Sequence, residues 1–162
     1  MRKLFIAAIT ALATATPAMA NPYRAISTSS LTKAVEDTGT RVIYDSAPCY
    51  EDRIYGYYQL AWDNAGNITK DVMGICVENH GSDYAELGDT LRHESIHVAQ
   101  ACNDGAPMLG WNVLAQYATP SIMSMVQRYP VEDQHLELEA FVSAKMLSND
   151  QVAGIVRKVC NQ

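Results

Sequence analysis

Polar and apolar residues follow a strand-like pattern in the first half of the chain. The segments 54–62 and 68–77 are rich in tyrosine and other β-forming residues, and the turn-forming residues 63–67 separate them. This arrangement predicts a β-hairpin, and the run 40–44 predicts a third strand ahead of it. Residues 45–48 are typical of a turn.

Most of the remaining segments follow the period of helices. Helices are predicted where apolar residues recur three and four positions apart between capping and breaking residues. Three helices are expected over residues 29–37, 130–147 and 149–160. A further helix should begin after Gly81 or Gly88 and end at Cys102, and another should begin at Pro120. Residues 105–118 are expected to form a loop. The pattern therefore predicts an α+β fold, a small antiparallel sheet followed by a helical half.

The first 20 residues have the features of a secretory signal peptide. Arg2 and Lys3 precede the apolar run 4–15, and Ala18-Met19-Ala20 matches a cleavage site. The apolar run is too short to span a membrane, and no later stretch approaches the necessary length. We therefore expect a signal peptide over 1–20, a single domain over 21–162, and export to a bacterial periplasm or secretion.

The net charge of the chain indicates which classes of partner it can bind. Removal of the signal peptide takes away two positive charges, so the formal net charge changes from −6 to −8. An acidic chain without a basic cluster has nothing to bind phosphate backbones, so no nucleic-acid partner is expected.

All four cysteines lie beyond residue 20. An even number of cysteines in an exported chain predicts two disulfides, for which three pairings exist. We favour Cys49–Cys76, which flanks the hairpin, and Cys102–Cys160, which joins the ends of two predicted helices. A cysteine-rich zinc site is disfavoured because no C-x-x-C spacing occurs.

The segment His93-Glu94-Ser95-Ile96-His97 matches H-E-x-x-H. Residues four apart share one face of a helix, so both imidazoles can point at a single ion. Neutral imidazole is a good zinc ligand, and a carboxylate beside zinc-bound water, here Glu94, is a suitable general base. A chance match remains the alternative, but half of the four histidines fall in this one turn.

A catalytic zinc site needs a third protein ligand. The extended metzincin motif is absent, because Gln100 and Asn103 stand where its glycine and last histidine would be. The remaining candidates are His80, His135, Glu137 and Glu139. The two glutamates lie about 200° apart on a helix, so only one can face the H-E-x-x-H helix.

His93, Glu94, His97 and the segment Glu137-x-x-Ala140 resemble the gluzincin group of zinc metallopeptidases, in particular its small members. The resemblance spans roughly residues 90–147 and implies a zincin-like fold. It also implies that His93, His97 and Glu137 bind Zn²⁺, with Glu139 as the alternative, and that Glu94 is the general base. An extended peptide would add to an edge strand of the sheet, a known recognition mode.

The sequence departs from this group at Phe141, where many relatives have an aspartate that supports a zinc-binding histidine. Gln100, one turn beyond His97, is a possible substitute. No residue matches the oxyanion-stabilising histidine or tyrosine of larger relatives, and the candidates are Tyr117, Tyr129 and His135.

We therefore expect an exported, monomeric zinc metallopeptidase that acts on a peptide or protein substrate and has no membrane span. Two alternatives are another periplasmic zinc hydrolase, for example one that cleaves cell-wall peptides, and an inactive zinc-stabilised binding domain. An intact Glu94 argues against the inactive domain, because a structural site does not use a carboxylate beside an open position.

Overall fold

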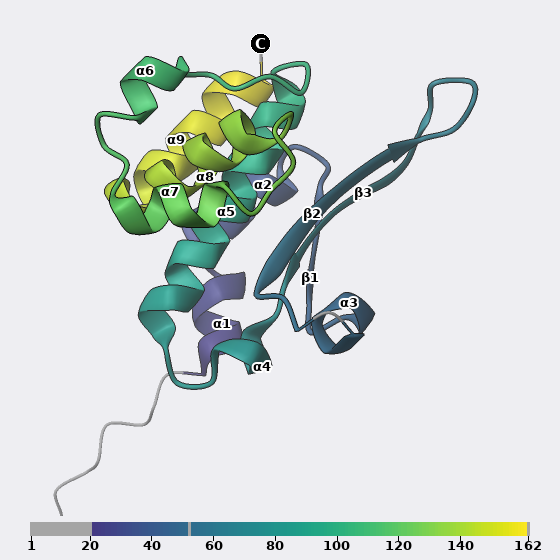
Figure 1. Ribbon diagram of the computed structural model, residues 1–162. Helices are drawn as coiled ribbons and strands as arrows, with labels where there is room; N and C mark the ends of the chain where they lie inside the picture. The colour runs from purple at the N-terminus through teal and green to yellow at the C-terminus, as the bar shows by residue number, and fades with distance from the viewer. Residues whose placement is uncertain (1–20, 52, 162) are drawn as a thin grey trace, which may run out of the picture.

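The structure is a computed structural model that describes residues 21–51 and 53–161 (Figure 1). The expected signal peptide, residues 1–20, lies outside the described residues. Within those residues, no helix is both long enough and apolar enough to cross a membrane. A three-stranded sheet lies beside a larger group of helices, so the α+β class is confirmed.

The sheet has the strand order β1-β3-β2, with β1 (Arg41–Tyr44), β2 (Gly56–Trp62) and β3 (Ile68–Ile75). β2 and β3 form the predicted antiparallel hairpin. Its turn is held by the Asp63 carboxylate, which accepts hydrogen bonds from the backbone N–H groups of Ala65 and Asn67, each at 2.9 Å. The local turn chemistry that predicted the hairpin is therefore the chemistry that closes it.

The third strand corrects the prediction of a purely antiparallel sheet. β1 pairs in parallel with β3, with Arg41 opposite Val72 and Tyr44 opposite Ile75. The chain leaves β1 through the short helix α3 (Ala47–Glu51), which includes part of the expected turn, and does not form a tight hairpin between β1 and β2. β3 lies between the other two strands, and it runs parallel to β1 and antiparallel to β2.

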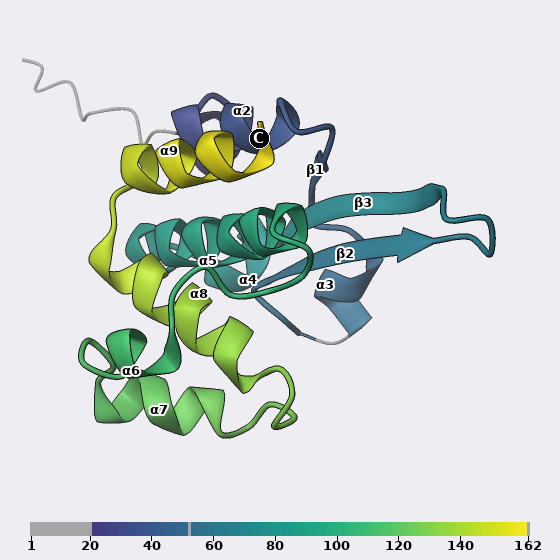
Figure 2. The same cartoon turned by 90° about the horizontal axis from the view of Figure 1, so that it is seen from above.

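The long helix α5 (Tyr84–Cys102) lies at the centre of the molecule (Figure 2). It begins beyond Gly81 and not beyond Gly88, because the Asp83 side chain caps it by accepting a hydrogen bond from the N–H of Glu86 at 2.9 Å. The short helix α4 (Val77–His80) connects it to β3. One face of α5 packs against β2 and β3, and other faces pack against helices.

The other helices form layers on the two sides of α5 (Figure 2). On one side lie α1 (Pro22–Ser27), α2 (Ser30–Glu36) and α9 (Asn149–Cys160), and on the other lie α8 (Gln134–Met146), α7 (Pro120–Val126) and α6 (Trp111–Leu114). α6 interrupts the expected loop 105–118. α8 begins four residues later than expected, because a hydrogen bond of 2.9 Å from the N–H of Asp133 to the carbonyl of Pro130 closes a turn ahead of it.

Two groups of buried apolar side chains hold these layers together. The larger lies between the sheet, α2, α5 and α9, and its fully buried members include Leu31, Met73, Ile75, Ile96 and Val156. The smaller lies between α6, α7 and α8, and its buried members are Leu114, Ile122, Val126, Leu138 and Val142. α8 therefore contributes to a second core that is separate from the sheet.

The two disulfides are Cys49–Cys76 and Cys102–Cys160, the pairings that we favoured. The first ties α3 to the end of β3. The second joins the carboxyl ends of α5 and α9, which are 58 residues apart in the sequence. Both bonds are compatible with an oxidising compartment.

Replacement of both Cys102 and Cys160 by serine should lower the free energy of unfolding by about 4 kcal/mol, because a loop of this length is no longer closed in the unfolded chain. Urea denaturation of the purified protein measures this loss. The control is the double serine variant of Cys49 and Cys76, which opens a shorter loop and should lose slightly less. A loss below about 1 kcal/mol would contradict this account of the bond.

Candidate metal centre

Two helices bring together three side chains that could hold a metal ion. His93 and His97 lie one turn apart on α5, and Glu137 lies on α8, which packs against α5. The Nε2 atoms of the two histidines are 3.1 Å apart. The Glu137 carboxylate lies 3.3 Å from Nε2 of His93 and 3.5 Å from Nε2 of His97. The three side chains therefore turn their ligand atoms toward one point.

The two distances from Glu137 to the histidines fit a shared ion better than direct hydrogen bonds. A charge-assisted hydrogen bond from imidazolium to carboxylate spans about 2.7–2.9 Å. Ligand atoms bound about 2.1 Å from a tetrahedral ion lie about 3.4 Å from one another. The Oε2 atom of Glu137 is buried and has no hydrogen-bond partner among the described residues. A cation between the three side chains would supply the partner that this oxygen lacks.

Burial sets the charge state of the ligands. It lowers the pKa of His93 to about 4, and burial together with the neighbouring His93 lowers the pKa of His97 to about 4. Both imidazoles are therefore neutral near pH 7, the form that binds metals. Burial raises the pKa of Glu137, and an adjacent cation would favour its ionised form.

Gln100 fixes the orientation of His97. The amide Nε2 of Gln100 donates to the carboxylate of Glu139 at 2.9 Å and to the carbonyl of Leu136 at 3.0 Å. Its Oε1 therefore faces Nδ1 of His97, at 2.8 Å, and accepts a hydrogen bond from that nitrogen. This tautomer leaves the lone pair of His97 Nε2 free for a metal. Gln100 thus has the supporting position expected for it.

Glu139, the alternative third ligand, also faces α5, contrary to the expectation that only one of the two glutamates would, but its partner there is Gln100. Its carboxylate accepts hydrogen bonds from Gln100 and from the backbone N–H groups of Met108 and Leu109, at distances of 2.7–3.0 Å. It is 1% exposed. Its role in the structure is to join α5, α8 and the loop before α6, a role that the sequence analysis missed.

His93 is held by packing, whereas His97 is held by a hydrogen bond. The ring of Phe141 lies 4.4 Å from the ring of His93, centroid to centroid. The Nδ1 atom of His93 is buried and has no hydrogen-bond partner among the described residues. Phe141 therefore supports His93 by apolar contact.

Glu94 lies beside the three ligands and below the start of β2. Its side chain is buried, and burial together with the charge of Glu137 raises the pKa of Glu94 to about 8. Gly56 makes this approach of the strand possible, because a Cβ atom at that position would lie 2.7 Å from Thr90 and 2.8 Å from Glu94. The edge strand β2 therefore begins directly over the carboxylate.

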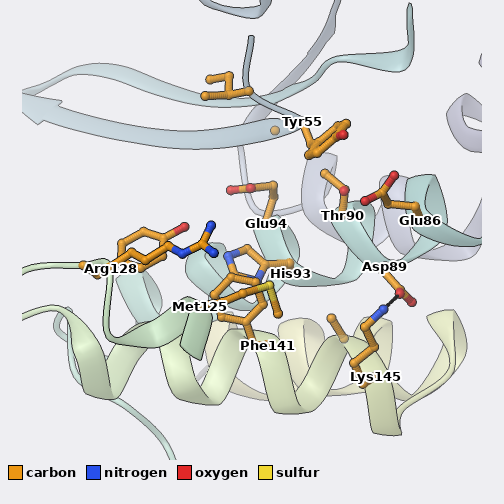
Figure 3. Close-up of a pocket in the computed structure, with 14 residues that line it drawn as sticks. Tyr55, Glu86, Asp89, Thr90, His93, Glu94, Met125, Arg128, Phe141 and Lys145 are labelled. Carbon is orange, nitrogen blue, oxygen red and sulfur yellow. Dashed lines mark hydrogen bonds and ion pairs between the residues drawn. The ribbon is translucent and has the colours of Figure 1, made fainter. Parts of the chain in front are cut away.

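A cavity of about 370 Å³ opens beside His93 and Glu94 (Figure 3). Tyr129 lines it, and burial with the charges of Glu137 and Glu94 raises the pKa of Tyr129 to about 12, so this hydroxyl remains protonated near pH 7. Arg128 and Met125 also line the cavity. No local sequence pattern marks either residue, so neither was predicted.

The remaining candidates lie elsewhere. His80 is buried, with its ring 4.7 Å from that of Tyr55 and its Nδ1 3.8 Å from the carboxylate of Glu86. Nε2 of His135 lies 2.9 Å from the carbonyl of Leu109. Neither residue joins the three ligands. Tyr117 is exposed and is not among the residues that line the cavity.

Comparison of the chain with protein-family models, curated proteins and solved structures finds no match.

Replacement of Gln100 by alanine should weaken metal binding roughly 10- to 100-fold, because His97 loses the acceptor that fixes its tautomer and ring orientation. Competition with a chromogenic chelator measures the dissociation constant. The matched control is Gln116→Ala, which removes an exposed glutamine amide that donates to the carbonyl of Asn112. Equal metal affinities of the two variants would show that Gln100 does not support the site.

Proposed function

We propose that the protein is an exported zinc metallopeptidase that hydrolyses peptide bonds. The observation that carries the proposal is the combination of two histidines and a glutamate around one point with a further carboxylate, Glu94, at the edge of a cavity. Three ligands from the protein leave one position free, which is the arrangement of catalytic zinc sites and not of structural ones.

The donor set favours zinc among the common metals. Two imidazole nitrogens and one carboxylate oxygen are a frequent ligand combination for catalytic zinc. Calcium and magnesium prefer oxygen ligands only. Zinc, when bound, would supply polarisation of a carbonyl group and a lower pKa for water.

Glu94 would act as the general base. A catalytic base functions best when its pKa lies near the working pH, and burial brings the Glu94 carboxyl into this range. A cation in the site would favour the ionised form, which accepts a proton from the attacking water. Glu94 would then return this proton to the leaving amine, so one residue serves both proton transfers.

The other groups around Glu94 suit a peptide substrate. We propose that an extended peptide pairs its backbone with the free edge of β2, which begins at Gly56 over the catalytic carboxylate. The protonated hydroxyl of Tyr129 would donate a hydrogen bond to the oxygen on which negative charge develops. The two disulfides agree with export.

Glu94→Gln should keep the fold and one zinc per chain but lower kcat by roughly 10²- to 10⁴-fold, because the base is removed and all three ligands remain. Hydrolysis of a fluorogenic peptide library and metal analysis of the same samples measure both effects. The control is Glu86→Gln, which changes an acid elsewhere in the cavity. Cleavage by Glu94→Gln at the wild-type rate would rule out the peptidase assignment.

Glu137→Ala should lose stoichiometric zinc, because two histidines alone hold the ion weakly. The melting temperature of the wild type should fall when a chelator removes zinc, whereas that of Glu137→Ala should not respond, since only a metal bound to the native state stabilises it. The matched control is Glu132→Ala, an exposed glutamate just before α8. Retention of one zinc per chain by Glu137→Ala would place the third ligand elsewhere.

A further inference from the structure

The cavity beside the metal centre has two cationic side chains on opposite sides, Arg128 and Lys145 (Figure 3). Lys145 forms an ion pair with Asp89. In the part of the chain that the structure describes, the guanidinium of Arg128 has no hydrogen bond or ion pair. Arg128 therefore brings an unpaired positive charge to the cavity.

The fold holds Arg128 at this position. The residue follows α7, and its N–H donates to the carbonyl of Met125 at 3.0 Å, while the N–H of Tyr129 donates to the carbonyl of Val126 at 3.1 Å. α7 is in turn fixed to α8 by the smaller core, in which Val126 is fully buried. Figure 3 shows the guanidinium pointing toward His93. A firmly placed backbone thus directs the charged end to the metal side of the cavity.

Three acidic side chains line the cavity, namely Glu86, Asp89 and Glu94. Glu94 lies on the side of Arg128 (Figure 3), but the two form no ion pair in the described part of the chain. Glu86 and Asp89 lie on the side of Lys145, away from Arg128 (Figure 3). The wall between the two ends includes the apolar side chains of Met125 and Phe141. A ligand that fills the cavity therefore meets a cation near the metal centre and an apolar surface beside it.

We propose that Arg128 binds a carboxylate group of the substrate, so that the cavity selects peptides with an acidic group next to the bond that is cleaved. A guanidinium matches a carboxylate through two parallel hydrogen bonds. A neutral ligand would displace water from the guanidinium without giving it a carboxylate partner. The free energy of that lost hydration would not be compensated, so neutral ligands are disfavoured. This inference rests on the proposed peptidase function for the meaning of the cleaved bond.

Two sources can provide the carboxylate. One is the free C-terminus of a peptide, which would make the enzyme a carboxypeptidase, and the other is a glutamate or aspartate side chain within a longer peptide. Arg128 has the same chemistry toward both. The length of the peptide and the blocking of its C-terminus separate the two cases.

Binding of three peptides tests the proposal without reliance on turnover. The probes are alanine-rich hexapeptides with a free C-terminus, with an amidated C-terminus, and with an amidated C-terminus and one central glutamate. Calorimetry measures their affinities for zinc-loaded Glu94→Gln, in which hydrolysis is blocked, and for the same protein carrying Arg128→Ala, Arg128→Lys or the control Arg24→Ala. Arg24 is an exposed arginine on α1, and metal-free wild type is a second reference.

Arg128→Ala should weaken binding of at least one carboxylate peptide by roughly 10- to 100-fold, and should leave the fully amidated neutral peptide unchanged. Arg128→Lys should recover part of the loss, because the charge remains but the paired hydrogen bonds do not. Arg24→Ala should bind all three peptides like its parent. The peptide that responds to Arg128→Ala identifies the source of the carboxylate.

Equal loss for the neutral and the carboxylate peptides, or no loss for any of them, would overturn the proposal. If Arg128→Ala in an otherwise wild-type protein lowered kcat equally for all three peptides, Arg128 would act on the reacting oxygen and not on a substrate carboxylate. That result would also overturn the proposal. If Arg128-dependent binding is found and zinc-loaded wild type cleaves none of the peptides, the carboxylate site stands and the peptidase function fails.

Discussion

The packing of α5 against α8 is the contact on which the rest of the structure depends. It is made by polar groups as much as by apolar ones, because the buried carboxylate of Glu139 reaches Gln100 on α5 and the backbone of the loop before α6. A buried carboxylate without such partners would cost several kcal/mol. Gln100 also orients His97 through a hydrogen bond, so the same side chain stabilises the helix pair and sets the geometry of the candidate ligands.

The second constraint is the burial of the polar residues at the candidate metal centre. Burial keeps both histidines neutral and raises the pKa of the two carboxyl groups of Glu94 and Glu137. A cluster of this kind gains stability when a cation enters it, since the cation pairs with groups that the fold has removed from water. Metal binding at this site would therefore be coupled to folding by electrostatics as well as by geometry.

Local patterns in the sequence predicted much of this arrangement. The H-E-x-x-H spacing, the hairpin turn at Asp63 and the capped starts of α7 and α9 are all set by residues close together in the chain. The parallel pairing of β1 with β3 was not predictable in this way, because it depends on which strand inserts between the other two. The tie between Glu139 and residues 108–109 joins segments 30 residues apart, and the position of Arg128 depends on how α7 packs, so neither leaves a local pattern.

Glu137 and Glu139 also explain how α8 acquires a definite rotation about its own axis. Apolar residues occur on several sides of this helix, so hydrophobic burial alone distinguishes poorly between neighbouring rotational settings. The two carboxylates have different partners, one the histidines of α5 and the other the amide groups of Gln100, Met108 and Leu109. A turn of the helix by one residue would remove both from their partners at once. Two separate sets of polar partners thus favour one rotational setting of α8, which apolar packing alone would leave undetermined.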